Sequence, residues 1–184
     1  MNEFSLYVLD ITMNSVRAGA SAVDIILREE GEWLHFSVSD NGCGMTEAQL
    51  SRLGNPFFTT RKTRNVGFGI PFLKMLAEMT GGYIQITSVH ESVSAKHGTT
   101  TAATFGRNHL DFVPLGDMVD TVKTLVHGSP DIDFTFKHQT EKGTVQFAAA
   151  EIRQILGEDI SLAEPEVLAW IEGNLREQYA AIQK

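Results

Sequence analysis

Hydrophobic positions in the first part of the chain repeat with two different periods. A spacing of three to four residues puts Phe4, Val8 and Ile11 on one face of a predicted helix over residues 2–17, which Gly19 ends. Further helices are predicted over residues 46–54, beginning with a Thr-Glu-Ala-Gln capping box, and over residues 71–79. Alternation with period two predicts strands over residues 22–28, 33–39, 83–88 and 99–105. These elements predict an α+β fold with a mixed, largely antiparallel sheet.

The pattern restarts after Gly106. Helices are predicted over residues 115–126, 151–156 and 164–181. Strands at 132–137 and 145–148 form a predicted hairpin around a Glu-Lys-Gly turn. We therefore divide the chain into a first domain, residues 1–106, and a small α+β C-terminal unit of unknown role, residues 107–184. The pattern does not say whether this unit folds by itself or packs onto the first sheet.

Composition and charge exclude several classes of function. The chain of 184 residues has a formal net charge of −8, which argues against nucleic acid as a partner. It lacks an apolar run of the length that spans a membrane, and its first residues do not resemble a signal peptide. Its single cysteine, Cys43, cannot form an internal disulfide. We therefore expect a cytoplasmic protein that does not bind membranes.

The charge is divided unevenly between the two parts of the chain. Residues 1–106 hold 10 acidic and 8 basic side chains, whereas residues 107–184 hold 13 acidic and 7 basic ones. An anionic ligand is therefore expected on the first part. The acidic second part is typical of a protein-contact or solvated surface.

Polar residues on the first helix form a possible ligand site. Asp10, Asn14 and Arg17 stand at positions i, i+4 and i+7, so they share one face. A carboxylate, an amide and a guanidinium in this order suit a hard metal ion with an anion beside it. A solvated polar stripe is the alternative, and it is the commoner explanation for a single helix.

A second clue lies at the end of a strand. Leu34, Phe36 and Val38 occupy the buried parity of residues 33–39, and Asp40 continues that parity. A buried carboxylate needs a hydrogen-bond donor, such as the exocyclic amino group of a base. The Asn-Gly-Cys-Gly sequence that follows allows a flat ligand to come close, although Asp-Asn-Gly by itself also describes an ordinary turn.

The third clue is a basic loop in front of a helix. Arg61, Lys62 and Arg64 precede Gly67 and Gly69, which lead directly into the predicted helix over residues 71–79. Free backbone N–H groups at such a helix start bind phosphate. A solvated loop is again the alternative.

Four segments occur in one order: D-I-T-M-N-S-V-R-A, D-N-G-C-G-M, N-P-F-F-T-T-R-K followed by V-G-F-G-I, and a final G-T-T strand. Together they resemble the GHKL ATPase superfamily, and the approach to the basic loop is most similar to sensor histidine kinases. The resemblance covers residues 1–106. It implies the Bergerat fold, a two-layer α/β sandwich, with ATP and magnesium as cofactors.

The resemblance also implies a role for each matching residue. Asp40 resembles the carboxylate that accepts from the adenine amino group, and Thr99 the threonine that helps to bind adenine through a water. Asn14 resembles the magnesium ligand, and Arg17 a residue that reaches a phosphate. The remaining positions flank the base (Gly42 and Gly44), supply the basic lid residues (Arg61 and Lys62) or face the triphosphate (Gly67 and Gly69).

Two departures from the family pattern affect the expected chemistry. Asp10 stands where most of the family has a glutamate, the catalytic carboxylate that orients the attacking water, so it is shorter by one methylene group. The lid is also short, because only residues 63–66 lie between the basic pair, Arg61 and Lys62, and the glycines. Both departures disfavour fast hydrolysis.

Three functions remain after these observations. The first is an ATP-dependent protein kinase that phosphorylates a partner protein in trans, because no acceptor-histidine helix precedes the ATP site. The second is an ATP-gated regulatory switch that binds a partner with little catalysis. The third is a slow ATPase. A homodimer is a further alternative for the assembly.

Overall fold

The computed structural model describes residues 2–53, 69–157 and 159–182. The helices are α1 (Phe4–Arg17), α2 (Glu47–Leu50), α3 (Gly69–Met79), α4 (Met118–Gly128), α5 (Ala149–Leu156) and α6 (Pro165–Ile182). The strands are β1 (Ala22–Glu30), β2 (Trp33–Asp40), β3 (Tyr83–Val89), β4 (Gly98–Gly106), β5 (Asp133–Thr140) and β6 (Gly143–Ala148). Each predicted helix and strand is present, with shifts of a few residues at its ends. One such shift occurs at α4, where Asp117 accepts a hydrogen bond from the backbone of Asp120 and starts the helix later than predicted.

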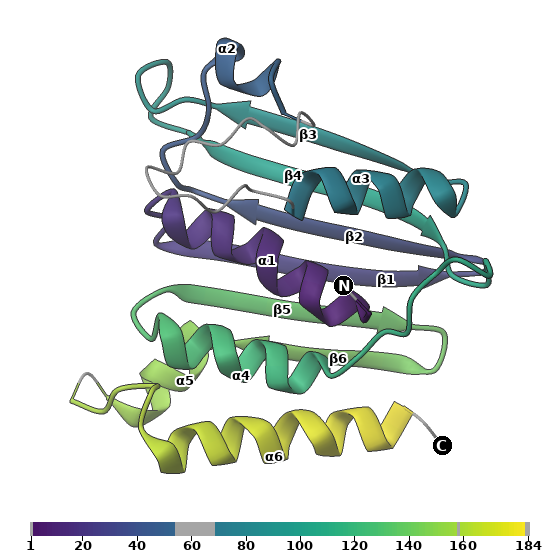
Figure 1. Ribbon diagram of the computed structural model, residues 1–184. Helices are drawn as coiled ribbons and strands as arrows, with labels where there is room; N and C mark the ends of the chain where they lie inside the picture. The colour runs from purple at the N-terminus through teal and green to yellow at the C-terminus, as the bar shows by residue number, and fades with distance from the viewer. Residues whose placement is uncertain (1, 54–68, 158, 183–184) are drawn as a thin grey trace.

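The described strands form one six-stranded sheet in the order β3-β4-β2-β1-β5-β6 (Figure 1). Strands β1 and β5 run parallel, whereas the other neighbouring pairs are antiparallel. This confirms the predicted mixed, largely antiparallel sheet. Strands β5 and β6 belong to the C-terminal segment, so that segment extends the sheet of the first one. The division of the chain at residue 106 stays a prediction.

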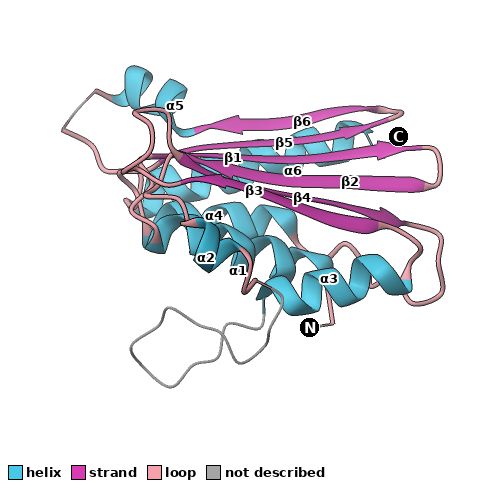
Figure 2. Ribbon diagram, turned by 90° about the horizontal axis from the view of Figure 1, so that it is seen from above, coloured by secondary structure: helices cyan, strands magenta, loops and turns pink. Residues whose placement is uncertain are grey.

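Helices α1, α3 and α4 lie side by side on one face of the sheet, which gives the expected two layers (Figure 2). The core between them contains an aromatic cluster around Phe4, which is fully buried. Its ring lies 5.4 Å from that of Phe36 on β2 and 5.1 Å from that of Phe105 on β4, both in edge-to-face geometry. Helix α1 is thereby fixed over the centre of the sheet.

The segment before α4 also holds the start of α1. Glu3 at the N-cap makes no side-chain capping bond, so the first N–H groups of α1 need other acceptors. The N–H groups of Phe4 and Ser5 donate to the carbonyls of Pro114 and Leu115, at 2.8 and 2.9 Å. The C-terminal segment therefore completes an element of the N-terminal one.

Within the described residues, no helix has the length and apolar character needed to cross a lipid bilayer.

Candidate nucleotide-binding site

The carboxylate of Asp40 is held by three donors, none of them charged. The hydroxyl of Ser15 donates to Oδ2 at 2.6 Å. The backbone N–H groups of Gly42 and Thr99 donate to Oδ1 at 2.9 and 3.2 Å. A carboxylate offers about four lone-pair positions, so one acceptor position is left after these three bonds. Among the described residues, no cation forms an ion pair with Asp40, which is half-buried.

Strand register brings these groups together. Leu34, Phe36 and Val38 of β2 are each 2% exposed, and Asp40 continues their parity at the last position of the strand, as predicted. Asp40 is paired with Thr99 in the antiparallel ladder between β2 and β4. The site therefore lies where β2 ends and β4 begins, beside the last turn of α1.

The turn after Asp40 is fixed by Asn41. Its side-chain oxygen accepts from the backbone N–H groups of Ser21 and Ala22 at 2.9 and 3.0 Å. Its amide nitrogen donates to the hydroxyl of Ser21 at 2.9 Å. These bonds tie the turn to the beginning of β1, so the position of Asp40 does not depend on a ligand.

Packing within the chain requires both glycines of this turn. A Cβ atom at Gly42 would lie 2.8 Å from the Cβ atom of Ala18. Gly44 has a φ of +67°, and a Cβ atom there would overlap the carbonyl of Val89. The prediction that these glycines also flank a base stays a prediction.

The polar face of α1 is present as predicted. The guanidinium of Arg17 donates to Oδ1 of Asn14 at 3.2 Å, so the two side chains form one polar unit. The carboxylate of Asp10 lies against Gly69, the first residue of α3, where a Cβ atom would overlap it. The start of α3 therefore meets the face of α1 that carries the predicted metal ligand. Arg61, Lys62, Arg64 and Gly67 lie outside the described residues.

The residues on this face fit magnesium better than a metal that needs a full protein cage. The described part of the chain contains no group of three or more His, Cys, Asp or Glu side chains that would hold a metal ion. Magnesium is commonly held by one or two protein oxygens together with substrate phosphates and water. The amide oxygen of Asn14 has a second lone pair beside the bond from Arg17, so it is able to serve as such a ligand.

Sequence reasoning missed three contributors to the site. Ser15 continues the spacing of Phe4, Val8 and Ile11, so its hydroxyl in an apolar stripe is the available signal; it is 4% exposed and donates to Asp40. Ser88 bonds the hydroxyl of Thr99 at 2.8 Å. His97 bonds the carbonyl of Gly42 through Nδ1, and because a carbonyl only accepts, Nδ1 carries the proton. Nothing local in the sequence indicates the last two contacts.

Comparisons with known proteins identify the family of the first part of the chain. Residues 3–109 match the family described as "Histidine kinase-, DNA gyrase B-, and HSP90-like ATPase". Sporulation kinase B of Bacillus subtilis (strain 168) is 30% identical over 96 residues, which cover 50% of this chain and 21% of the kinase. Sensor histidine kinase ZraS of Escherichia coli (strain K12) is 30% identical over 83 residues, 44% of this chain and 18% of the kinase. The chain thus spans about a fifth of the length of these relatives.

Two solved structures have the same fold. The MutL ATPase domain of Aquifex aeolicus, solved in complex with ADP, has a TM-score of 0.55 at 13% identity, covering 85% of this chain and 69% of that one. The N-terminal domain of a DNA repair protein has a TM-score of 0.57 at 15% identity, covering 80% and 52%. At such identities the likeness shows the fold alone. Since the family match covers more than half of the chain and includes Asp10, Asn14, Asp40 and Thr99, this chain belongs to the family of histidine kinase-, DNA gyrase B- and HSP90-like ATPases.

Proposed function

We propose that this chain binds ATP with magnesium beside Asp40 and passes the γ-phosphate to a residue of a partner protein. The observation that carries the nucleotide assignment is the Asp40 carboxylate, held by Ser15, Gly42 and Thr99 with one acceptor position remaining. The exocyclic amino group of adenine is a neutral donor of the right kind to fill that position. A charged donor is not needed, since the carboxylate is only half-buried.

The phosphates are assigned to the polar face of α1. Asn14 would be the protein ligand of magnesium, and Arg17, exposed beside it, is suited to a phosphate oxygen. When bound, magnesium supplies positive charge that offsets the charge of the phosphate oxygens. Arg61, Lys62 and Gly67 remain proposed phosphate contacts on the basis of the sequence alone, and Gly69 is proposed to face the triphosphate from the start of α3.

The transfer itself is proposed from the kinase relatives. The bond between the γ-phosphorus of ATP and the β–γ bridging oxygen breaks, and ADP leaves with that oxygen. A bond forms between the γ-phosphorus and an oxygen or nitrogen of the acceptor, which loses a proton. Asp10 is the proposed catalytic carboxylate, positioned against Gly69 to orient the attacking group. Because this carboxylate is shorter than the usual glutamate, transfer to water is expected to be slow.

A regulatory switch is the second candidate, and one contact favours it. Gly69 is the first residue of α3 and lies against the carboxylate of Asp10. A movement of Asp10 on nucleotide binding would therefore shift the start of α3. In this reading ATP alters the position of α3, and a partner recognises the altered surface with little catalysis.

Label transfer from ATP distinguishes the candidates. The chain is incubated with γ-labelled ATP and magnesium, alone and with the products of neighbouring genes. Label on a partner protein, lost in Asp40→Ala and retained in the matched Asp131→Ala, is the expected result; Asp131 is an exposed loop residue. If labelled phosphate is released and no protein is labelled, the chain is a slow ATPase and not a kinase. If ATP binds tightly but neither labelled protein nor free phosphate forms, the regulatory switch is the remaining function.

The metal assignment is tested by calorimetry rather than by activity. Asn14→Ala is expected to bind ATP with an affinity that no longer depends on magnesium, whereas the exposed Asn108→Ala keeps the dependence of the wild type. An unchanged magnesium dependence in Asn14→Ala would remove Asn14 from the metal site.

A further inference from the structure

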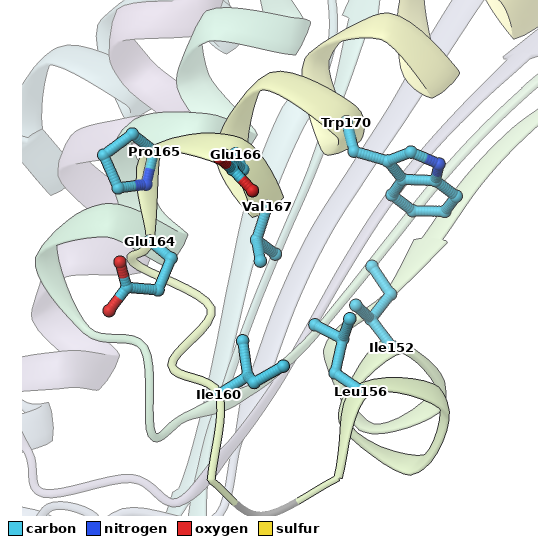
Figure 3. A pocket seen from close by; sticks show the side chains of 8 residues that line it. All are labelled: Ile152, Leu156, Ile160, Glu164, Pro165, Glu166, Val167 and Trp170. Atoms are coloured by element: carbon cyan, nitrogen blue, oxygen red, sulfur yellow. The ribbon is translucent and has the colours of Figure 1, made fainter.

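An apolar groove lies between α5 and α6, far along the chain from the nucleotide site. Its volume is about 520 Å³, which suits several side chains of a bound molecule. Ile152 and Leu156 of α5 line one side, and Val167 and Trp170 of α6 line the other, as Figure 3 shows. Ile160, from the connection between the helices, lies at the same opening.

The apolar side chains around this groove are unusually accessible. Trp170 is 56% exposed and Ile160 is 43% exposed, and both line the groove. Single exposed apolar residues are common, but two of them at one apolar hollow mark a contact site. Tryptophan is also the residue type most enriched among those that dominate binding energy. The groove therefore has the character of an interface.

The charges at the groove indicate the kind of partner. Glu164 and Glu166 line it, and neither forms an ion pair with any described residue. Further along the same helix, Glu172 is paired with both Lys123 and Arg176. The C-terminal part of the chain thus neutralises an acidic residue away from the groove and leaves the groove itself acidic.

We propose that this groove docks a basic amphipathic helix from a partner protein. An apolar face would enter between Leu156 and Trp170, and lysine or arginine residues beside it would meet Glu164 and Glu166. A helix is favoured over an extended peptide because the described residues that line the groove belong to α5, α6 and their connection and not to a strand, so they offer no strand edge for backbone pairing. A second copy of the chain is disfavoured, since it would bring another acidic groove on a chain of net charge −8.

This proposal does not depend on the proposed catalysis. The groove residues make none of the contacts that hold Asp40, so variants there are expected to bind ATP as the wild type does. Loss of peptide binding with unchanged ATP binding would concern the groove alone. Loss of ATP binding in Asp40→Ala with unchanged peptide binding would concern the nucleotide site alone.

The test uses a synthetic amphipathic helical peptide with leucines on one face and lysines beside them. The matched control peptide carries glutamates in place of the lysines. In a Trp33→Phe background Trp170 is the single tryptophan, so its emission reports on the groove directly. The lysine peptide is expected to shift this emission to shorter wavelength and to bind at least about tenfold more tightly than the glutamate peptide.

Variants of the groove complete the test. Trp170→Ala and Glu164→Lys are each expected to weaken the lysine peptide about tenfold by calorimetry, whereas Glu141→Lys, on an exposed turn, leaves it unchanged. If Trp170→Ala fails to fold by circular dichroism, Glu164→Lys decides the outcome. Failure of the lysine peptide to bind, equal binding of both peptides, or equal effects of Glu164→Lys and Glu141→Lys would overturn the proposal. A dimer in sedimentation that Glu164→Lys dissociates would also overturn it, in favour of a self-interface.

Discussion

The candidate nucleotide site and the ion pairs between α4 and α6 hold acidic side chains in opposite ways. Asp40 is held by a hydroxyl and two backbone N–H groups, without a described cation. In the C-terminal part, Asp117 is bonded by Arg176, and Glu172 by Arg176 and Lys123. A carboxylate that is oriented but not neutralised retains its charge for a ligand. Paired carboxylates are already satisfied, so they indicate packing rather than binding.

The pairs in the C-terminal part shift pKa values without adding much stability. The backbone N–H of Asp120 is the main cause that lowers the pKa of Asp117, and Arg176 contributes to the same shift. The hydrogen bond to Lys123 lowers the pKa of Glu172. Ion pairs near the surface add little stability, because water screens the charges and ordering two long side chains costs entropy. The stability of this region must come from its apolar core.

A buried polar network joins the two regions across residue 106. Nε2 of His138 on β5 lies 3.1 Å from Glu29 on β1, and Nδ1 lies 2.9 Å from the hydroxyl of Tyr179 on α6. Burial lowers the pKa of His138, and Glu29 opposes this only in part because Arg107 is already paired with it at 2.7 Å. Neutral His138 therefore donates from Nε2 and accepts from Tyr179.

The largest expected effect tests whether the regions are separable at all. Phe136 on β5 is 2% exposed and pairs with Ile25 on β1 and Phe147 on β6. Phe136→Ala is expected to cost about 3–5 kcal/mol of unfolding free energy. Because β1 connects this core to the nucleotide site, calorimetry should show one transition, shifted as a whole. Two transitions, of which only one is shifted, would show that the two parts of the chain unfold separately. The control is Val93→Ala, which changes an exposed residue.

The next effect concerns the unpaired carboxylate. Asp40→Ala removes the proposed acceptor of the adenine amino group and is expected to weaken ATP binding about 100-fold in calorimetry, since bonds to charged groups are worth about 1.5–3 kcal/mol. The free energy of unfolding should also fall, but by less than in Phe136→Ala, because Ser15, Gly42 and Thr99 lose the acceptor of their hydrogen bonds. Affinity equal to that of Asp131→Ala would end the assignment of Asp40.

A smaller effect is expected from the group that orients this carboxylate. Ser15→Ala leaves the charge of Asp40 in place and removes the hydrogen bond to Oδ2. ATP binding should weaken by about tenfold. Ser15→Thr retains a hydroxyl and is the matched control. If Ser15→Ala binds ATP as tightly as Ser15→Thr does, the orienting role of the hydroxyl is wrong.

The smallest effect is a pH dependence from the network that joins the regions. The pKa of His138 is lowered in the folded protein, so the unfolded chain binds more protons below its ordinary pKa of about 6.5. The stability that neutral His138 contributes is therefore fully present above pH 6.5. It is lost as the pH falls from 6.5 towards the lowered pKa of the folded protein. The unfolding free energy is measured in urea between pH 7.5 and 5.5. It should depend less steeply on pH in His138→Gln than in His127→Gln, where an exposed histidine is changed. Equal slopes would show that His138 is not the source.

Local patterns predicted much of the fold because its elements obey local rules. The parity of Leu34, Phe36 and Val38 indicated both β2 and the orientation of Asp40, and the glycine at position 19 marked the end of α1. The pairing of β1 with β5 could not be predicted in this way. It joins residues about a hundred positions apart, and a hydrophobic strand carries no mark of its neighbour.

Candidate site residues could be predicted where a polar side chain interrupts the hydrophobic pattern of a helix or strand. Asp40 stood out as a charge in a buried parity, and Asp10 and Asn14 as polar groups on a packed helix. Ser15 was hidden because a hydroxyl fits an apolar stripe without contradiction. His97 and Ser88 act through loop geometry that no spacing encodes.

The most direct measurement is a crystal structure of the chain with magnesium and a non-hydrolysable ATP analogue. The account predicts the exocyclic amino group of adenine within about 3 Å of a carboxylate oxygen of Asp40, with Ser15 still bonded to Oδ2. A purine bound elsewhere, or a basic side chain of the protein paired with Asp40 in its place, would contradict it.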